Sequence, residues 1–198
     1  MTLSIKSINS FEKENIVEEV TSLVFAGFNS KFTKALFKET EAHEIIYAFC
    51  HYIYTEQGEN LLIAIQDKLV CGCMFVTRKS DSHQKLYQNL RKFLSFSQCL
   101  KLIFLLSLLS HKPAQNERYI DFITVSPNFR GQGIGKTLIS HCLETFHDEQ
   151  ITLYVAKNNI GAYNLYRTIG FQVIQKENSI LMGVLTGIKK WQKMEWIQ

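Results

Sequence analysis

The chain has 198 residues, of which 46% are hydrophobic and 20% are charged, and its formal net charge is +4 at pH 7. This composition excludes a disordered chain, and the length predicts one α/β domain with a substantial core over residues 1–198. The charge favours an anionic cofactor, but no dense lysine and arginine stripe is present, so no nucleic-acid partner is predicted.

The cysteine pattern favours a reducing compartment. The five cysteines are scattered, odd in number and without a Cys-x-x-Cys pair, which predicts reduced thiols and a cytoplasmic location. The N-terminal stretch MTLSIKSINS lacks the apolar core of a signal peptide. Neither the cysteines nor the six histidines cluster at metal-ligand spacing, so no metal is predicted.

The chain begins with the pattern of a strand and a helix. Residues 3–8 (LSIKSI) alternate as a short strand does. Asn9 and Glu12 have the spacing of a capping box, so a helix is expected to start there. Gly27 is expected to end that helix, because glycine commonly follows the last helical residue.

A second helix and a hairpin are predicted next. Apolar residues recur at helical spacing over about residues 30–55. The segments 60–67 and 68–79 then read as two strands that turn at Asp67-Lys68.

Residues 81–112 interrupt this succession of predicted helices and strands with a strongly apolar segment of helical composition. A membrane span needs roughly 20 apolar residues, whereas Gln98 and Lys101 fall inside the apolar run here. We therefore predict no membrane span but a helical insertion that packs on the domain. A membrane-surface contact or a homodimer contact through this segment is the less favoured alternative.

The last part of the chain has a regular alternation of strands and helices. The first of its strands is apolar on both faces, which predicts a central place in the sheet. The expected order is strand, glycine-rich loop, helix, strand, helix, strand and strand, over residues 119–125, 126–133, 134–146, 151–156, 159–170, 171–177 and 189–198.

The glycine-rich loop, PNFRGQGIGKT at 127–137, predicts a phosphate-binding site. Glycines let backbone N–H groups approach an anion, and the helix that follows adds the positive end of its dipole. The triphosphate motif requires a glycine at position 130, where this chain has arginine. The dinucleotide motif, counted from Gly131, requires a glycine at position 136, where this chain has lysine. Neither pattern therefore fits.

Two signatures resemble those of the GCN5-related N-acetyltransferase (GNAT) superfamily. VSPNFRGQGIGKTLI is similar to its pyrophosphate-binding pattern Q/R-x-x-G-x-G/A, which is filled by Arg130, Gly133 and Gly135. VAKNNIGAYNLYRTIGF is similar to a second pattern, N-x-x-A-x-x-L-Y-x-x-x-G-F, filled by Asn159, Ala162, Leu165, Tyr166, Gly170 and Phe171. Together with the preceding strand they cover the core at residues 119–171.

The resemblance implies the acyl-CoA N-acyltransferase fold, an α/β fold with a mixed, mostly antiparallel central sheet flanked by helices. The insertion at 81–112 would then lie between strands 3 and 4. The sheet is expected to splay between 119–125 and 151–155, which makes the cofactor cleft. The implied reaction transfers an acetyl group from acetyl-CoA to a primary amine of a small molecule, a protein or a peptide.

The resemblance also implies the cofactor contacts. The backbone of Ile123 and Val125 would pair with the pantetheine arm, and Asn159 would hydrogen-bond it. The pyrophosphate would be held by the loop residues Arg130, Gly131, Gln132, Gly133, Ile134, Gly135 and Lys136.

Tyr166 is the predicted general acid for the departing thiolate. In the family this position stands beside the sulfur, although a helix tyrosine can also be half-buried with a backbone partner. Tyr154 is the alternative acid.

Asp121 is the predicted general base, acting directly or through water. It lies in an apolar strand, where partial desolvation raises a carboxyl pKa. By alternation it shares a face with Ile123 and Val125 unless a bulge intervenes. A purely structural carboxylate is an equal alternative, and Glu117 is a weaker candidate base.

Two other classes of function stay open. One is a non-catalytic acyl-CoA-binding module, and the other is a protein that docks on a membrane or partner through the apolar helix 93–109. The acceptor pocket is expected to involve a loop at Gly27-Phe28-Asn29, residues 177–189 and the insertion.

Overall fold

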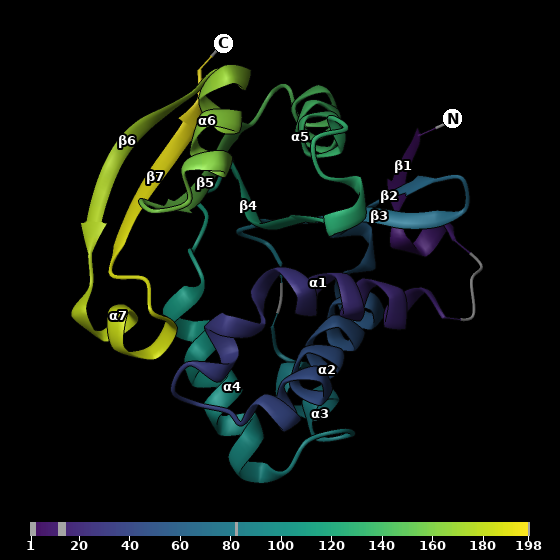
Figure 1. Ribbon diagram of the computed structural model, residues 1–198, viewed down its shortest axis with the longest axis vertical. Helices are drawn as coiled ribbons and strands as arrows, with labels where there is room; N and C mark the ends of the chain where they lie inside the picture. Colours follow the sequence, from purple (N-terminus) through teal and green to yellow (C-terminus); the bar gives the residue numbers. More distant parts are fainter. Residues whose placement is uncertain (1–2, 12–14, 82, 198) are drawn as a thin grey trace.

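A computed structural model describes residues 3–11, 15–81 and 83–197 of the chain (Figure 1). Its strands and helices are β1 (Leu3–Ser7), α1 (Ile16–Thr33), α2 (Glu39–Gln57), β2 (Leu61–Gln66), β3 (Leu69–Arg78), α3 (Leu86–Leu90), α4 (Phe96–Leu109), β4 (Glu117–Val125), α5 (Ile134–Thr145), β5 (Gln150–Ala156), α6 (Ile160–Ile169), β6 (Phe171–Asn178), α7 (Ile180–Thr186) and β7 (Lys190–Trp196).

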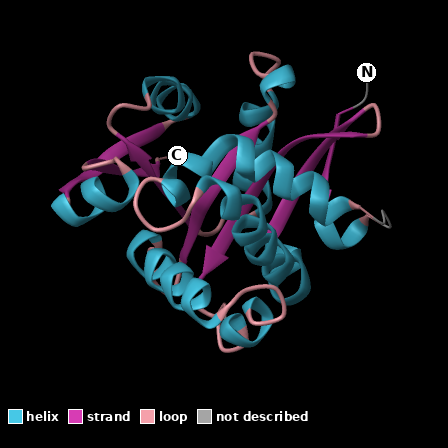
Figure 2. Ribbon diagram, turned by 60° about the horizontal axis from the view of Figure 1, so that its bottom comes forward, coloured by secondary structure: helices cyan, strands magenta, loops and turns pink. Residues whose placement is uncertain are grey.

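One seven-stranded sheet runs in the order β1-β2-β3-β4-β5-β7-β6. The β4–β5 pair is parallel, and the other neighbouring pairs are antiparallel. Helices cover both faces of the sheet (Figure 2). The predicted fold class, a mixed and mostly antiparallel sheet flanked by helices, is therefore confirmed.

The sheet separates two hydrophobic cores. On one face, which we call the α1 side, side chains of β2 and β3 pack with α1, α2, α3 and α4. On the other face, the α5 side, the central strands pack with α5 and α6. Successive residues of a strand point to opposite faces, so each central strand contributes to both cores.

The predicted helix start at Asn9 is wrong. Asn9 lies in a short 3-10 turn, and α1 begins at Ile16 with Asn15 in the N-cap position. Glu12, the other half of the expected capping box, lies outside the described residues. The spacing of a capping box can occur where no helix follows, because the tertiary packing decides where the first turn forms.

The predicted helix end at Gly27 is also wrong, and so is the expected loop at residues 27–29. Gly27 lies within α1, which continues to Thr33. A Cβ atom at Gly27 would come 2.5 Å from the Thr124 hydroxyl oxygen, so glycine allows α1 to lie close against β4. The second helix, α2, accordingly starts at Glu39 rather than near residue 30.

The predicted hairpin of β2 and β3 is confirmed. Asp67 and Lys68 have φ angles of 51° and 68°, and they are the two turn residues between the strands. Two positive φ values fit the twist of a two-residue hairpin turn.

The insertion forms α3 and α4 between β3 and β4, as predicted. Its inward side chains join the core of the α1 side: Leu90, Leu94, Cys99, Leu102 and Leu105. Ser95 and Gln98 form a capping box at the start of α4, so Gln98 closes the helix end rather than merely interrupting an apolar run. Among the described residues, no helix is long and apolar enough to cross a membrane.

The helix α7 was not predicted. Ser179 caps its start by accepting a hydrogen bond from the Met182 N–H group, and Gly187 ends it with a φ of 79°. Its seven residues are too few to show a clear helical period in the sequence. This helix packs near α1 and contributes to the wall of the site described next.

Candidate active site

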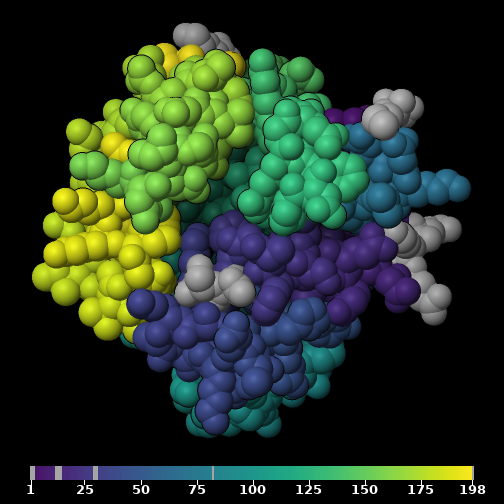
Figure 3. Space-filling view, viewed as in Figure 1, coloured from purple at the N-terminus to yellow at the C-terminus, as the bar shows by residue number. Residues whose placement is uncertain are grey.

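The strands β4 and β5 diverge and open a fork in the middle of the sheet. They pair from Glu117 and Gln150 to Ile120 and Leu153, and beyond Ile120 the residues of β4 have no partner on β5. The predicted splay is therefore confirmed. In Figure 3 a hollow lies between the lime-green surface of α6 and the green surface of α5, next to the purple surface of α1.

A pocket of about 670 Å³ occupies this fork, and its walls come from distant parts of the chain. Most of the wall comes from α1, the end of α4 with residues 110–112, the diverging parts of β4 and β5, α7 and the start of β7, and α2, α6 and β6 each add a residue. This volume lies in the usual range for small-molecule sites. The pocket is thus large enough for the reacting ends of two substrates.

The pocket brings together several predicted site residues and leaves others outside. Asp121, Ile123, Asn159 and Tyr166 line it, as does the alternative acid Tyr154. Val125 and the glycine-rich loop are not among its lining residues, since they lie further along, where β4 leads into α5.

The expectation that Asp121 shares a face with Ile123 and Val125 is wrong, because a bulge intervenes. Phe75 of β3 pairs with Phe122 and Val76 pairs with Ile120, which leaves Asp121 as the extra residue on β4. The bulge shifts the alternation there. Phe122 therefore packs into the α1 side, whereas Ile123 and Val125 pack into the α5 side.

Burial raises the pKa of Asp121 to about 6, while the nearby charge of Lys31 opposes this rise. Burial in turn lowers the pKa of Lys31 to about 8. Among the described residues, no hydrogen bond or direct ion pair is made by the Asp121 carboxylate. A carboxylate with such a pKa is largely ionised near neutral pH and can still accept a proton.

Tyr166 lies on α6 with its side chain buried against the ring of Phe171, at 5.9 Å between centroids. Burial raises the pKa of Tyr166 to about 12. Within the part of the chain that the structure describes, its hydroxyl makes no hydrogen bond. The hydroxyl therefore stays protonated and has its hydrogen-bonding capacity left for a ligand.

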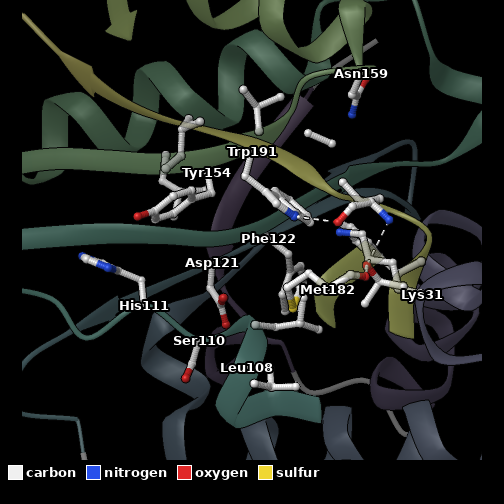
Figure 4. A pocket seen from close by; sticks show the side chains of 18 of the residues that line it. Lys31, Leu108, Ser110, His111, Asp121, Phe122, Tyr154, Asn159, Met182 and Trp191 are labelled. Carbon is white, nitrogen blue, oxygen red and sulfur yellow. Dashed lines mark hydrogen bonds between the residues drawn. The ribbon is translucent and has the colours of Figure 1, made fainter. Parts of the chain in front are cut away.

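Asn159 caps α6, as predicted, by accepting a hydrogen bond of 3.3 Å from the Ala162 N–H group through Oδ1. Its amide nitrogen is directed into the pocket in Figure 4. The cap fixes the side chain at the pocket wall, one helical turn before Tyr163 and two before Tyr166.

The alternative acid, Tyr154, has a partner already. Its hydroxyl donates a hydrogen bond of 2.6 Å to Oε1 of Glu177. Burial and this neighbouring carboxylate raise the pKa of Tyr154. Of the two tyrosines, Tyr166 is thus the one whose hydroxyl has no competing acceptor among the described residues.

Glu117 lies in a buried polar cluster that makes it a poor base. Its carboxylate accepts a hydrogen bond of 2.5 Å from Thr152 and lies 2.9 Å from Nζ of Lys193 and 3.0 Å from His111. Burial by itself raises the pKa of Glu117, but these partners and the Ala114 N–H group outweigh it and hold the pKa at about 2. The sequence contained no signal that would have joined residues so far apart.

The glycine-rich loop has the backbone that an anion site needs. Gly131 and Gly133 have φ angles of 78° and 81°, and Gly133 is the N-cap of α5. A Cβ atom at either glycine would meet nothing within 4 Å, so open space lies in front of this backbone. The first N–H groups of a helix have no intrahelical partner, so they can hold a phosphate there.

The backbone of Ile123 and Val125 faces the open fork. The Ser126 N–H group donates to the Cys71 carbonyl on the β3 side. Backbone groups of successive strand residues point to alternate sides, so those of Val125 and Ile123 point away from β3. Arg130 Nε, on that side, donates to the Val125 carbonyl at 3.3 Å.

The model of the Acetyltransferase (GNAT) family matches residues 28–171, which is more than half of the chain. The chain belongs to this family. The predicted resemblance is thereby confirmed, and the protein is an acetyl-CoA-dependent acyltransferase of the GNAT type. GNAT acetyltransferases act on amine acceptors.

Solved structures share the fold at low sequence identity. An N-acetyltransferase from Staphylococcus aureus Mu50 is 18% identical, with a TM-score of 0.71 over 97% of this chain and 99% of that one. The NatC complex bound to Gag peptide and CoA contains a chain that is 17% identical, with a TM-score of 0.63 over 100% and 99%. These likenesses show the GNAT fold alone.

One curated relative matches a short stretch. The Cysteine-rich protein 2-binding protein of Mus musculus is 39% identical over 57 residues, which is 29% of this chain. The match spans 7% of the length of that relative, so it carries no statement about the activity of the whole protein.

Proposed function

We propose that the protein is an N-acetyltransferase that moves an acetyl group from acetyl-CoA to a primary amine by direct attack. The observation that carries this proposal is the pocket at the fork, because Asp121 and Tyr166 reach it from different elements. The glycine-rich loop lies where β4 leads out of that fork into α5. When bound, acetyl-CoA supplies an acetyl group activated as a thioester.

The cofactor contacts follow from the exposed backbone. The N–H groups of residues 130–136 hold the pyrophosphate at the start of α5, with charge added by Arg130 and Lys136. The pantetheine arm lies along the free edge at Ile123 and Val125 and reaches the amide of Asn159. Acetyl-CoA therefore fits the residues that this chain has at the fork.

Asp121 acts as the base. It removes a proton from the incoming ammonium group, directly or through water, and the neutral nitrogen attacks the carbonyl carbon. The raised pKa of Asp121 supports this role, because a base works best when its pKa is near the working pH. The Val125 N–H group is the donor for the carbonyl oxygen as charge develops on it.

Tyr166 acts as the acid. As the new C–N bond forms and the C–S bond breaks, its hydroxyl gives a proton to the departing sulfur. The tyrosine then takes the second proton from the acylated nitrogen, so it returns to its starting state. One proton leaves in total, and Asp121 releases it to water.

The competing functions are less well supported. A non-catalytic acyl-CoA-binding module needs neither a carboxylate of raised pKa nor a tyrosine hydroxyl left without a partner in the pocket. The described part of this chain has both, at Asp121 and Tyr166. Docking through residues 93–109 has one supporting observation, the exposed Phe96, Leu100 and Phe104 on α4. We further propose that residues 1–198 act as one domain, because α4 shares a core with α1 and α2.

A screen tests the proposal. Small amines and peptides are incubated with acetyl-CoA, and the free thiol of CoA is measured together with the mass of the acetylated product. Peptides belong in the screen because the NatC structure contains one. We expect thiol release that depends on an acceptor, with loss of release in Asp121→Asn. CoA binding without such release for any amine would favour the non-catalytic module.

A further inference from the structure

Lys31 is a cation in the acceptor part of the pocket that neither signature accounts for. It lies on α1, and its Nζ atom is 4.4 Å from the centroid of the Phe28 ring and 5.5 Å from that of Trp191. Figure 4 shows Asp121 near the middle of the pocket, with His111 to its left and Lys31 to its right.

Among the residues that the structure describes, none makes an anionic contact with the charge of Lys31. It influences Asp121 electrostatically, yet the two side chains form no direct ion pair. Within the described residues, no other carboxylate pairs with it. A cation taken partly out of water is costly unless an anion compensates it, and two aromatic rings compensate it only in part.

The pocket that holds this cation also has an apolar part to its lining. Side chains from α1, α2, α4, α7 and the segment before β7 supply it: Phe28, Phe32, Phe49, Leu106, Leu109, Met182 and Ile188. An acceptor that fills this space without losing affinity must present hydrocarbon or aromatic surface to it.

We infer that the acceptor is an α-amino acid with an apolar or aromatic side chain, whose carboxylate binds Lys31 and whose amine lies at Asp121. This inference rests on the proposed function and deepens it. The ammonium group of the amino acid meets the carboxylate of Asp121, its carboxylate meets the ammonium of Lys31, and its side chain meets the apolar wall.

A simple amine fits the same pocket less well. Its ammonium group is attracted by Asp121 but repelled by Lys31, and no group of the ligand compensates the lysine. The amino acid reverses that balance, because its two charges lie opposite the two charges of the protein. A peptide N-terminus has an amide where the amino acid has its carboxylate, so it leaves Lys31 uncompensated.

The chemical step is that of the proposed function, with the α-nitrogen as the attacking atom. The N–C bond to the acetyl group forms, the C–S bond breaks, Tyr166 protonates the sulfur, and Asp121 takes the proton of the ammonium group. The carboxylate takes no part in bond changes. It only orients the nitrogen.

The experiment compares three acceptors that share one aromatic body and one amine: L-phenylalanine, L-phenylalaninamide and 2-phenylethylamine. For the wild type we expect kcat/KM for phenylalanine to exceed that for each of the others by about 30-fold or more, a usual effect of leaving one buried charge unpaired. In Lys31→Met and Lys31→Gln the ratio of kcat/KM for phenylalanine to that for each other acceptor should fall to about threefold or less, because the positive charge that binds the carboxylate has been removed.

Lys34→Met is the matched control, since it removes the same charge just beyond the end of α1, at a residue outside the pocket lining. In this variant the kcat/KM ratio between phenylalanine and each of the other two acceptors should equal that of the wild type. Equal kcat/KM values for the three acceptors, or a ratio that survives in both Lys31 variants, would overturn the inference.

The failures of the two proposals are distinguishable. If other amines in the screen are acetylated but phenylalanine is not, the inference is wrong and the N-acetyltransferase stands. If no amine or peptide gives thiol release while CoA still raises the melting temperature, both proposals are wrong. Because the three acceptors are compared on the wild type, the first result does not depend on whether a variant folds.

Discussion

The two sides of the fork are built in different ways. The proposed cofactor side, from the end of β4 to α6, depends on backbone conformation: two glycines of positive φ, a helix N-terminus and an asparagine cap. The proposed acceptor side depends on side chains that α1, α4, α7 and β7 bring together from distant parts of the chain. If these assignments hold, the comparison teaches that backbone conformation supports the shared chemical step, whereas side-chain packing decides the choice of acceptor.

The largest expected effect concerns Tyr166, the proposed acid. Tyr166→Phe removes one hydroxyl and keeps the ring, so folding and CoA binding should change little. Turnover on a verified acceptor should fall by about 10²–10⁴-fold, the usual contribution of a positioned acid. Steady-state kinetics and the CoA-induced rise in melting temperature measure the two effects separately.

Tyr163→Phe is the matched control, because Tyr163 lies on the same helix and is not a lining residue of the pocket. Its turnover should stay near that of the wild type. A Tyr166→Phe protein with wild-type turnover would assign the proton to another donor. Burial holds the Tyr166 pKa at about 12, so the pH profile over the usual range cannot test this role.

The polar cluster at the closed end of the fork should matter for stability. Glu117→Gln leaves the charge of Lys193 buried without its counterion, which typically costs about 3–5 kcal/mol of unfolding free energy. Urea denaturation measures the loss. A variant as stable as the wild type would show that the cluster does not hold the strands together.

The pH dependence of this effect has a definite sign. The folded-state pKa of Glu117 is lowered to about 2 from an ordinary value of 4.5. The carboxylate therefore stabilises the protein fully above pH 4.5, and this contribution is lost as the pH falls toward 2. The difference between wild type and Glu117→Gln should shrink over the same range.

Gly27→Ala tests how closely the acceptor side is packed on the sheet. A Cβ atom there would lie 2.5 Å from the Thr124 hydroxyl oxygen, so α1 or β4 must shift. We expect a loss of about 1–3 kcal/mol in unfolding free energy, as is usual for overpacking. Gly161→Ala, where a Cβ meets nothing within 4 Å, is the control and should be neutral or stabilising.

Gly133→Val tests the cofactor side by itself. Valine at a φ of 81° is strained by about 1–2 kcal/mol, and its side chain points into the space where the phosphates are proposed to lie. CoA affinity should fall by about tenfold or more, because the N–H groups can no longer approach the anion. Isothermal calorimetry with CoA measures this, and Mg-ATP should bind weakly to both proteins.

What the sequence predicted follows the same division. The residue types at Gly133 and Asn159 predicted a turn of positive φ and a helix cap, and the structure has both, because such positions demand particular residue types. The binding of phosphate by the loop at Arg130 stays a prediction. The helices and strands of the core followed from hydrophobic periodicity.

The remaining features depend on contacts between distant residues. Gly27 looked like a helix end but serves the approach of α1 to β4, and no local pattern tells these uses apart. The bulge that turns Asp121 to the α1 side arises from its pairing with β3. The partners of Glu117 and the position of Lys31 likewise required the tertiary structure.

The pH profile of kcat/KM tests the central claim, that Asp121 is the base for acetyl transfer in this pocket. Since burial raises the Asp121 pKa to about 6, kcat/KM of the wild type should fall tenfold per pH unit below about 6, as the base becomes protonated. Asp121→Asn should have little activity and no such limb, whereas Asp148→Asn, at an exposed carboxylate, should keep the wild-type profile. An unchanged rate and an unchanged acidic limb in Asp121→Asn would contradict the account.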